Sequence, residues 1–356
     1  MSDVSPRIPF LDLGRRTRAL APELGAALER VLESGRVLGG ERTEAFERAW
    51  AASCGRRRAV AVASGTEALR LAMLGLEIGA GDEVIVPAFT AVPTIAAVCA
   101  TGATPVPVDV DGETAALDRE AAAAAIGERT KAIIVVHLFG RPTALPDLGL
   151  PVIEDCAHAH GMRAAQRGVV AAYSFYPTKN LAGVGDGGAV VTDDEELAER
   201  VARLRMHGRG ADGSHLERAT NARMSEIEAA ALSVGLERLE ADNARRGAIA
   251  AELRRAAPGL DWQADHADHV NHLCVIRVDE RERFRRRLEF ETAIHYPRAL
   301  VDEPAYAAFE RPPVDNAREW ASRCLSLPCY PELTDSELER VCASLRSASA
   351  GARRPG

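Results

Sequence analysis

Short apolar runs alternate with segments of helical periodicity between residues 58 and 193, and this alternation is what most constrains the fold. Parallel strands cannot be joined by a tight turn, so each pair needs a crossover, which is usually a helix. The pattern therefore predicts βαβ units and a mostly parallel, seven-stranded sheet covered by helices on both faces. The expected strands lie in RAVAVAS (58–64), EVIVPAF (83–89), TPVPVDV (104–110), KAIIVVHLF (131–139), LPVIEDC (150–156), AAYSFYP (171–177) and GAVVTD (188–193).

The pattern changes near residue 225, where an amphipathic stretch, 225–260, predicts a long helix broken near Gly247. Beyond it, one expected strand in HLCVIRVD (272–279) is mixed with helical segments, which is typical of a small α+β unit. A chain of 356 residues usually exceeds one minimal domain. We therefore expect a large α/β domain at 1–235, opening with helix from about residue 20 to 50, and a smaller C-terminal α+β domain at 236–356.

The composition argues against several classes of protein. With a net charge of −8, the chain lacks the overall positive charge that is typical of proteins that bind nucleic acid. The first residues lack the pattern of a secretory leader and no run of 18 apolar residues occurs, so a cytoplasmic protein without a membrane span is expected. The seven cysteines form no C-x-x-C pair, which favours reduced thiols over a disulfide framework or a zinc site.

Lysine is almost absent, since only Lys131 and Lys179 among the 44 basic residues are lysine. Arginine stays charged, whereas a buried lysine loses its proton and forms a Schiff base with a carbonyl. A lysine retained in the glycine-rich stretch SFYPTKNLAGVGDGG (174–188) therefore favours a reactive amine at Lys179. The alternative is a lysine that survived by chance, and other residues must decide. Lys131 opens an expected strand and should be replaceable by arginine.

A second motif, SGTE, follows the first expected strand and precedes a helical pattern. Ser64 and Glu67 match a capping box, which is a sufficient structural explanation. The same geometry also suits a phosphate group, because free helix-terminal amides, a glycine that allows close approach at Gly65 and the Thr66 hydroxyl converge there. The two explanations remain equally open from these residues alone.

Asp155 ends an expected buried strand, where ligands of open α/β sheets gather. A buried carboxylate needs a cation or donors, so Asp155 is either a helix cap or the partner of a protonated ring nitrogen. Asp155, His158 and His160 also suggest a metal cluster, but no further ligands accompany them and we expect no metal. His137 is interpreted as a packed histidine.

The glycines Gly183, Gly185 and Gly188 match G-x-G-x-x-G, the pattern of dinucleotide-binding loops. Here the pattern precedes an expected strand instead of following one and opening a helix, so we reject that interpretation.

A phosphate cradle, a strand-end aspartate and a lysine 24 residues later together indicate one cofactor, pyridoxal 5'-phosphate. Its phosphate anchors it, a carboxylate keeps the ring nitrogen protonated so that the ring withdraws electrons, and a lysine binds it covalently and moves protons.

With these motifs, the sequence resembles the DegT/StrS sugar aminotransferases, which have the fold-type I architecture of pyridoxal-phosphate enzymes. The resemblance runs from IPFLDL through SGTEALRLAM, VIEDCAHAHG, SFYPTKNLAGVGDGG and NARMSEIEAAAL to LSLPCYPEL. It implies a homodimer with shared active sites. It also implies roles for individual residues: Lys179 holds the cofactor, Asp155 pairs with its ring nitrogen, Gly65, Thr66 and Ser174 bind its phosphate, and Asn221 reaches the phosphate across the dimer interface.

The sequence departs from the family pattern at two places. Ala91 stands where many relatives have an aromatic side chain stacked on the cofactor, and His158 stands where relatives usually have glutamine beside it. Arg36, His295 and Tyr296 are the predicted contacts to the sugar, from their position alone.

The resemblance implies transfer of an amino group from glutamate or glutamine to a nucleotide-linked keto-deoxysugar, most similar to action at C3 of a dTDP-3-keto-6-deoxyhexose. Alternatives are C4 amination or dehydration of a related sugar, although relatives specialised for dehydration replace the lysine by histidine. A catalytically silent regulator that binds cofactor or sugar, and a metal hydrolase using His158 and His160, are further alternatives.

Overall fold

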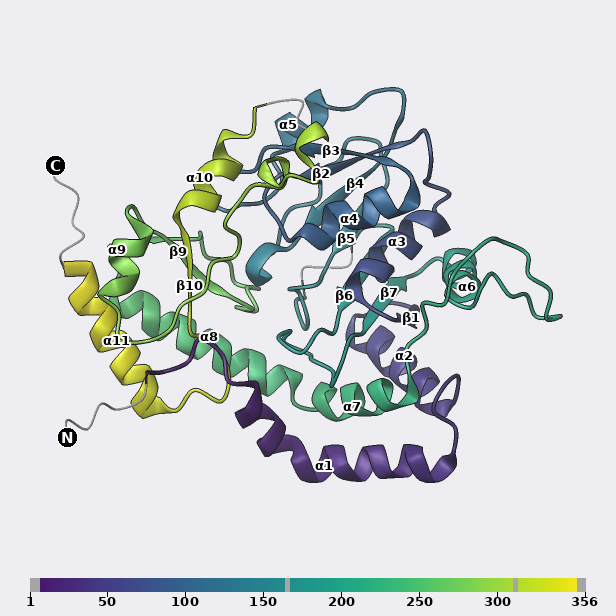
Figure 1. Cartoon of the computed structure of the whole chain (residues 1–356), viewed down its shortest axis with the longest axis horizontal. Helices are drawn as coiled ribbons and strands as arrows, with labels where there is room; N and C mark the ends of the chain where they lie inside the picture. The colour runs from purple at the N-terminus through teal and green to yellow at the C-terminus, as the bar shows by residue number, and fades with distance from the viewer. Residues whose placement is uncertain (1–6, 164–166, 310–312, 351–356) are drawn as a thin grey trace.

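Seven strands form one sheet in the computed structural model, which describes residues 7–163, 167–309 and 313–350. Their spatial order is β1-β7-β6-β5-β4-β2-β3. All neighbouring pairs are parallel except those that involve β7, which runs antiparallel to both β1 and β6. The predicted mostly parallel sheet is thereby confirmed (Figure 1). The strands are β1 (Arg58–Val62), β2 (Glu83–Pro87), β3 (Thr104–Val108), β4 (Thr130–Val136), β5 (Val152–Asp155), β6 (Val170–Ser174) and β7 (Gly188–Thr192).

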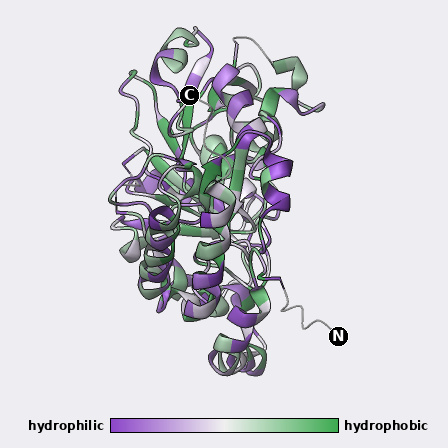
Figure 2. Ribbon diagram, turned by 90° about the vertical axis from the view of Figure 1, so that its left-hand side faces the viewer, coloured by the Kyte–Doolittle hydropathy of each residue, from purple (hydrophilic) through white to green (hydrophobic). Residues whose placement is uncertain are grey.

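Both faces of this sheet are buried because successive strand side chains point to opposite sides. On β1, Val60 and Val62 pack in a cluster with helices α3, α4 and α6, whereas Ala59 and Ala61 pack with α2 and α7. Hydrophobic residues accordingly concentrate in the central strands (Figure 2). The helices of this part are α1 (Leu13–Ser34), α2 (Glu41–Ser53), α3 (Gly65–Gly75), α4 (Val92–Thr101), α5 (Arg119–Ala124), α6 (Glu195–Leu204) and α7 (Glu226–Leu236), with a 3-10 turn η1 (Leu138–Gly140).

A second, three-stranded antiparallel sheet lies in the C-terminal part, in the order β10-β9-β8. Only β9 was expected from the sequence, because β8 has two residues and β10 lies directly after a helix without a turn signal. Its elements are α8 (Leu239–Ala256), β8 (Asp261–Trp262), β9 (Cys274–Arg277), α9 (Arg281–Arg286), η2 (Leu300–Asp302), η3 (Ala307–Phe309), α10 (Asp315–Arg323), β10 (Cys324–Leu327) and α11 (Asp335–Ala350). The division at residue 235/236 stays a proposal.

The predicted break near Gly247 is wrong. The chain instead breaks at Glu237 and Arg238, between α7 and α8, and Gly247 lies inside α8. Packing explains the difference: Leu232 of α7 belongs to the core of the large sheet, whereas Leu253 of α8 packs with the small sheet and α11. The point at which α7 ends is therefore set by the change of packing partner. The low helix propensity of Gly247 does not break α8. Likewise, the expected N-terminal helix is two helices, separated at residues 35–40.

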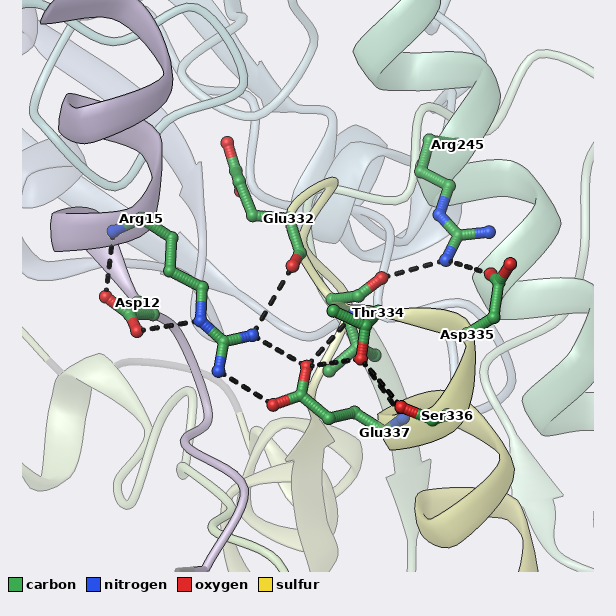
Figure 3. Close-up of polar contacts among 9 residues, drawn as sticks. Asp12, Arg15, Arg245, Glu332, Thr334, Asp335, Ser336 and Glu337 are labelled. Carbon is green, nitrogen blue, oxygen red and sulfur yellow. Dashed lines mark hydrogen bonds and ion pairs between the residues drawn. The ribbon is translucent and has the colours of Figure 1, made fainter.

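The start of α1 is fixed to α11 by an ion-pair network (Figure 3). Both terminal nitrogens of Arg15 donate to the Glu337 carboxylate, at 2.6 and 2.7 Å, and Arg15 also pairs with Asp12. The bond from Arg15 holds the pKa of Glu337 down, at about 2. This bidentate contact ties the segment just before α1, with Phe10 and Leu11, to the C-terminal part of the chain.

None of the helices within the described residues is long and apolar enough to cross a membrane.

Candidate active site

The carboxyl ends of the parallel strands border a cavity of about 350 Å³, which we call the first cavity. The loop after β1, the end of β5, the end of β6 and the loop after β2 all reach it, as expected for open α/β sheets. Six predicted site residues therefore meet in one place. The lining includes Ser64, Gly65, Thr66, Thr90, Ala91, Pro93, Asp155, Ala157, His158, Ser174, Tyr176, Lys179 and Asp186.

The N-terminus of α3 forms one wall of the first cavity. Ser64 caps the helix by accepting a hydrogen bond from the Glu67 amide at 3.2 Å, but the Glu67 carboxylate pairs with Arg70 instead of returning to Ser64. The capping box is thus half formed among the described residues. Gly65 is held so close to Ser174 that a Cβ added there would lie 2.5 Å from the Ser174 Cβ. A side chain at residue 65 would fill the space beside the helix amides that suits a phosphate group.

We expect Gly65→Ala to weaken cofactor binding and to lower the free energy of unfolding by about 1–3 kcal/mol, because overpacking displaces the helix terminus or Ser174. Gly247→Ala is the matched control: nothing lies within 4 Å of its added Cβ, and inside a helix it should add about 0.5–1 kcal/mol. Cofactor titration and chemical denaturation measure the two effects. Wild-type cofactor affinity in Gly65→Ala would contradict the predicted cradle.

Asp155 is 6 % exposed, at the end of β5. Its carboxylate accepts hydrogen bonds from the Thr94 hydroxyl at 2.9 Å and the Ala157 amide at 3.1 Å. Burial raises the pKa of Asp155, while these donors and Lys179 oppose the shift. A cation placed against this carboxylate in the first cavity would offset the cost of its burial.

Lys179 lies in a turn that follows β6, where its amide donates to the Tyr176 carbonyl at 2.8 Å. Burial lowers the pKa of Lys179 to about 8, and the nearby Asp155 opposes the shift. Arg16 of α1 donates to the Lys179 carbonyl at 3.1 Å and so fixes the backbone that carries the amine. The side chain is therefore held in the cavity with an amine that loses its proton more readily than an ordinary lysine.

Asp155, His158 and His160, which the sequence left as an alternative metal cluster, are not grouped as metal ligands among the described residues. The Nδ1 of His158 accepts from the Phe139 amide at 3.1 Å, and the Nε2 of His160 faces the Ser174 carbonyl at 2.9 Å. Burial lowers the pKa of both imidazoles, that of His160 to about 3, so both are neutral near pH 7. Within the described residues, the group with metal-like spacing is a different one, His137, Glu154 and Cys156.

His137 has the packed role expected of it. It is fully buried, its Nε2 lies 2.8 Å from the Glu154 carboxylate, and its Nδ1 accepts from the Thr143 amide at 3.0 Å. Both ring nitrogens therefore serve the internal hydrogen-bond network.

The glycine-rich loop after Lys179 leads into β7 and opens no helix, which confirms the rejection of a dinucleotide motif. Its glycines are needed for close packing. A Cβ at Gly183 would overlap the Glu228 carboxylate, and one at Gly188 would lie 2.3 Å from the Ser64 carbonyl oxygen. The Glu228 side chain accepts from the Gly185 amide at 3.0 Å and so holds the loop against α7.

A second cavity, of about 240 Å³, also borders Lys179. His158, Tyr176 and Lys179 line both cavities, so the two meet at the lysine. Its lining residues are Phe10, Leu11, His158, Tyr176, Thr178, Lys179, Arg246, His272, Leu273, His295, Tyr296, Leu327 and Cys329.

The four predicted contacts outside the first cavity divide into two groups. His295 and Tyr296 line the second cavity. Arg36 and Asn221 are exposed and line neither cavity of the same chain, Arg36 between α1 and α2 and Asn221 beside Met206 in an isolated bridge.

Sequence patterns did not reveal several residues that shape these cavities. Thr94 supports Asp155 from inside α4. His272 contacts His158 with tilted rings whose centroids are 4.2 Å apart, and its Nδ1 lies 3.0 Å from the Asn180 side-chain oxygen. Arg246 comes from the middle of α8. A threonine, a histidine and one arginine among many carry no local motif, so only their positions in the folded chain identify them.

A helix-terminal cradle, a buried strand-end carboxylate and a buried lysine with a lowered pKa fit the phosphate, the ring nitrogen and the aldehyde of pyridoxal 5'-phosphate. The fold and this site together define a pyridoxal-phosphate-dependent enzyme. The chain belongs to the DegT/DnrJ/EryC1/StrS aminotransferase family, whose model matches residues 19–346.

Two curated relatives resemble the chain over nearly its whole length. One is a dTDP-3-amino-3,4,6-trideoxy-alpha-D-glucose transaminase from Streptomyces venezuelae, 44 % identical over 96 % of this chain and 96 % of its own. Another is a UDP-N-acetyl-3-dehydro-alpha-D-glucosamine 3-aminotransferase from Acidithiobacillus ferrooxidans, 37 % identical over 95 % of this chain and 97 % of its own.

Among solved structures, that of DesV from S. venezuelae in complex with a ketimine intermediate matches with a TM-score of 0.92 and 42 % identity, over 99 % of this chain and 100 % of that one. The protein is therefore an aminotransferase that acts on nucleotide sugars, and its cofactor is pyridoxal 5'-phosphate.

Ala91 borders the first cavity at the start of α4, with His158 also in its lining. An aromatic ring stacked on the cofactor contributes roughly 0.5–1.5 kcal/mol beyond area burial, or about tenfold in affinity. We therefore expect Ala91→Phe to tighten cofactor binding by up to about tenfold and to retain activity, as measured by the dissociation constant of free cofactor. Unchanged or weaker binding would mean that another group already covers that face of the ring.

Proposed function

We propose that the protein transfers an amino group from glutamate or glutamine to the C3 keto group of a dTDP-linked 3-keto-6-deoxyhexose, as a step in amino-sugar biosynthesis. The observation that carries this proposal is the arrangement of two cavities that meet at Lys179, one suited to the cofactor and one open to a substrate. The 44 % identity with the S. venezuelae transaminase favours a dTDP-linked sugar aminated at C3.

In this proposal the bound cofactor would supply an electron sink for the electron pair left on the donor's α-carbon when that carbon loses its proton. Lys179 takes a proton from the donor's α-carbon and delivers a proton to a different carbon, the former aldehyde carbon of the cofactor, and the sugar half-reaction runs in reverse. Its low pKa suits a group that must act as both base and acid near neutral pH. Asp155 holds the proton on the ring nitrogen. Gly65, Thr66 and Ser174 bind the phosphate, and His158 lies beside the ring. His295 and Tyr296 bind the sugar from the second cavity.

The active form in this proposal is a homodimer. Tyr176 and Val184, which flank Lys179 in the chain, are each 51 % exposed, so apolar surface lies beside the site for a second copy to cover. Asn221 is exposed and lines neither cavity of its own chain, as a residue that serves the partner's phosphate would be. Arg36, also exposed, would contact the sugar from the same surface. We place this dimer in the cytoplasm.

The purified holoenzyme is to be incubated with L-glutamate and a panel of dTDP- and UDP-linked 3-keto and 4-keto sugars, with each product identified by mass and NMR. We expect preferred amination at C3 of a dTDP-linked sugar. Amination at C4, or loss of a hydroxyl without gain of nitrogen, would replace the proposed reaction by the alternative within the family. Lack of turnover with every sugar would favour a regulatory role.

A further inference from the structure

The second cavity contains a buried cation, Arg246, that has no acidic partner in the part of the chain that the structure describes. Arg246 is 4 % exposed in the middle of α8. One terminal nitrogen donates to the Cys329 carbonyl, while its Nε is buried without a hydrogen bond. Among the described residues, no carboxylate lies within ion-pair distance of this guanidinium, and Asp242 and Glu332 act on it only through space. An unpaired buried charge is costly, so a residue in this state is suited to an anionic ligand.

The remaining lining of the second cavity supports the same ligand class. The described residues around it include no aspartate or glutamate. Besides Arg246, its ionisable groups are Lys179, three histidines, Tyr176, Tyr296 and Cys329. Burial lowers the pKa of each of those histidines, which leaves Arg246 as the permanent positive charge beside Lys179. Phe10, Leu11, Leu273 and Leu327 form an apolar part of the wall. Such a wall reduces the local dielectric and strengthens an ion pair with a bound anion.

We propose that Arg246 binds the α-carboxylate of the amino donor, an inference that rests on the proposed function. The donor's amine must reach the first cavity at Lys179, and its α-carboxylate is attached to the same carbon as that amine. Because Lys179 borders both cavities, a donor bound there can place its carboxylate in the second cavity, where Arg246 offers planar, paired N–H groups. The sugar then enters the same space after the donor's keto acid has left.

The donor half-reaction tests this role without any sugar. L-Glutamate is added to the holoenzyme, and conversion of the cofactor to its amine form is followed by absorbance. We expect Arg246→Met to raise the glutamate concentration for half-maximal conversion roughly 10- to 100-fold, because a charge-assisted contact is lost. Arg246→Lys should recover part of this loss. Calorimetric affinity for glutarate, an unreactive dicarboxylate, should weaken in parallel.

Arg254→Met is the matched control, since Arg254 lies on the same helix, contacts Trp262 and the Gln263 carbonyl, and does not line the cavity. It should leave the donor half-reaction unchanged. Amination of the ketosugar by enzyme already in the amine form should fall by a clearly smaller factor in Arg246→Met, because the ketosugar shares the cavity but has no α-carboxylate for Arg246 to bind. An equal loss in both half-reactions, or none in either, would overturn the proposal.

The wild-type protein provides a test that does not depend on folding of a variant. L-Glutamine lacks only the γ-carboxylate of glutamate, whereas L-isoglutamine lacks only the α-carboxylate. We expect isoglutamine to be the much poorer donor, and equal use of both would overturn the assignment to the α-carboxylate. If no ketosugar is aminated but glutamate conversion still depends on Arg246, the proposed sugar substrate fails while the carboxylate site stands.

Discussion

Lys179→Ala is expected to lose transamination by about 10³-fold or more while the protein keeps its fold. The variant lacks both the amine that binds the cofactor covalently and the group that moves the proton, and a positioned acid–base group alone contributes about 10²- to 10⁴-fold. The rate with glutamate and the preferred ketosugar measures the loss. Circular dichroism should show an unchanged fold, because Lys179 is held through its backbone by Arg16 and its side chain faces the cavities.

Lys131→Arg is the matched control, since Lys131 is the other lysine in the chain and is exposed on β4. It should retain wild-type activity. Borohydride reduction of the wild-type holoenzyme should fix the cofactor on Lys179, as found by peptide mapping. A label on Lys131, or wild-type turnover by Lys179→Ala, would remove the assigned role.

The pKa of Lys179 makes the same assignment testable by pH. Burial lowers this pKa to about 8, and only the neutral amine is nucleophilic. In the cofactor-free protein, the rate of cofactor capture should therefore rise as pH increases and level off above about pH 8. An ordinary lysine would keep accelerating to about pH 10. Stopped-flow absorbance distinguishes the two profiles.

Asp155→Asn is expected to retain bound cofactor but to lower turnover by about 10²- to 10³-fold, the usual loss when one preorganised charge contact is removed. Asparagine keeps the shape of the side chain and one acceptor oxygen, which can still accept from the Ala157 amide, but it loses the charge. The ring nitrogen would therefore lose its proton and the ring would withdraw electrons less strongly. The phosphate cradle and Lys179 are separate contacts and should still hold the cofactor. Absorbance spectra and single-turnover rates measure retention and loss.

Asp194→Asn provides the control for this charge removal. Asp194 caps α6 by accepting from the Leu197 amide at 3.0 Å, a bond that asparagine can also accept, and it is remote from the first cavity. It should change activity little. Near-normal turnover by Asp155→Asn would mean that the carboxylate is structural, serving only Thr94 and Ala157.

The sequence by itself determined the features that depend on local order along the chain. Apolar runs with helices between them favoured a parallel sheet, because parallel strands need a crossover, which is usually a helix, whereas antiparallel neighbours can be joined by a short turn. Parallel strands of one sheet end at the same edge, so Ser64, Asp155 and Ser174 could be expected to lie together from their positions after strands alone. The cofactor could be inferred from residues that have few roles other than binding it. The most informative of these was Lys179, because the chain uses arginine for nearly all its other basic residues.

Tertiary structure alone decided which residues from distant segments complete the site. Arg246 and Arg254 share a helix and have the same local sequence character, yet only Arg246 is buried against a cavity, because the helix meets the N-terminal segment and the small sheet on that side. The break between α7 and α8 arose in the same way, from a change of packing partner and not from Gly247. Helical periodicity specifies which residues share a face, but what that face meets depends on contacts between residues far apart in the chain, and local propensity carries no information about them.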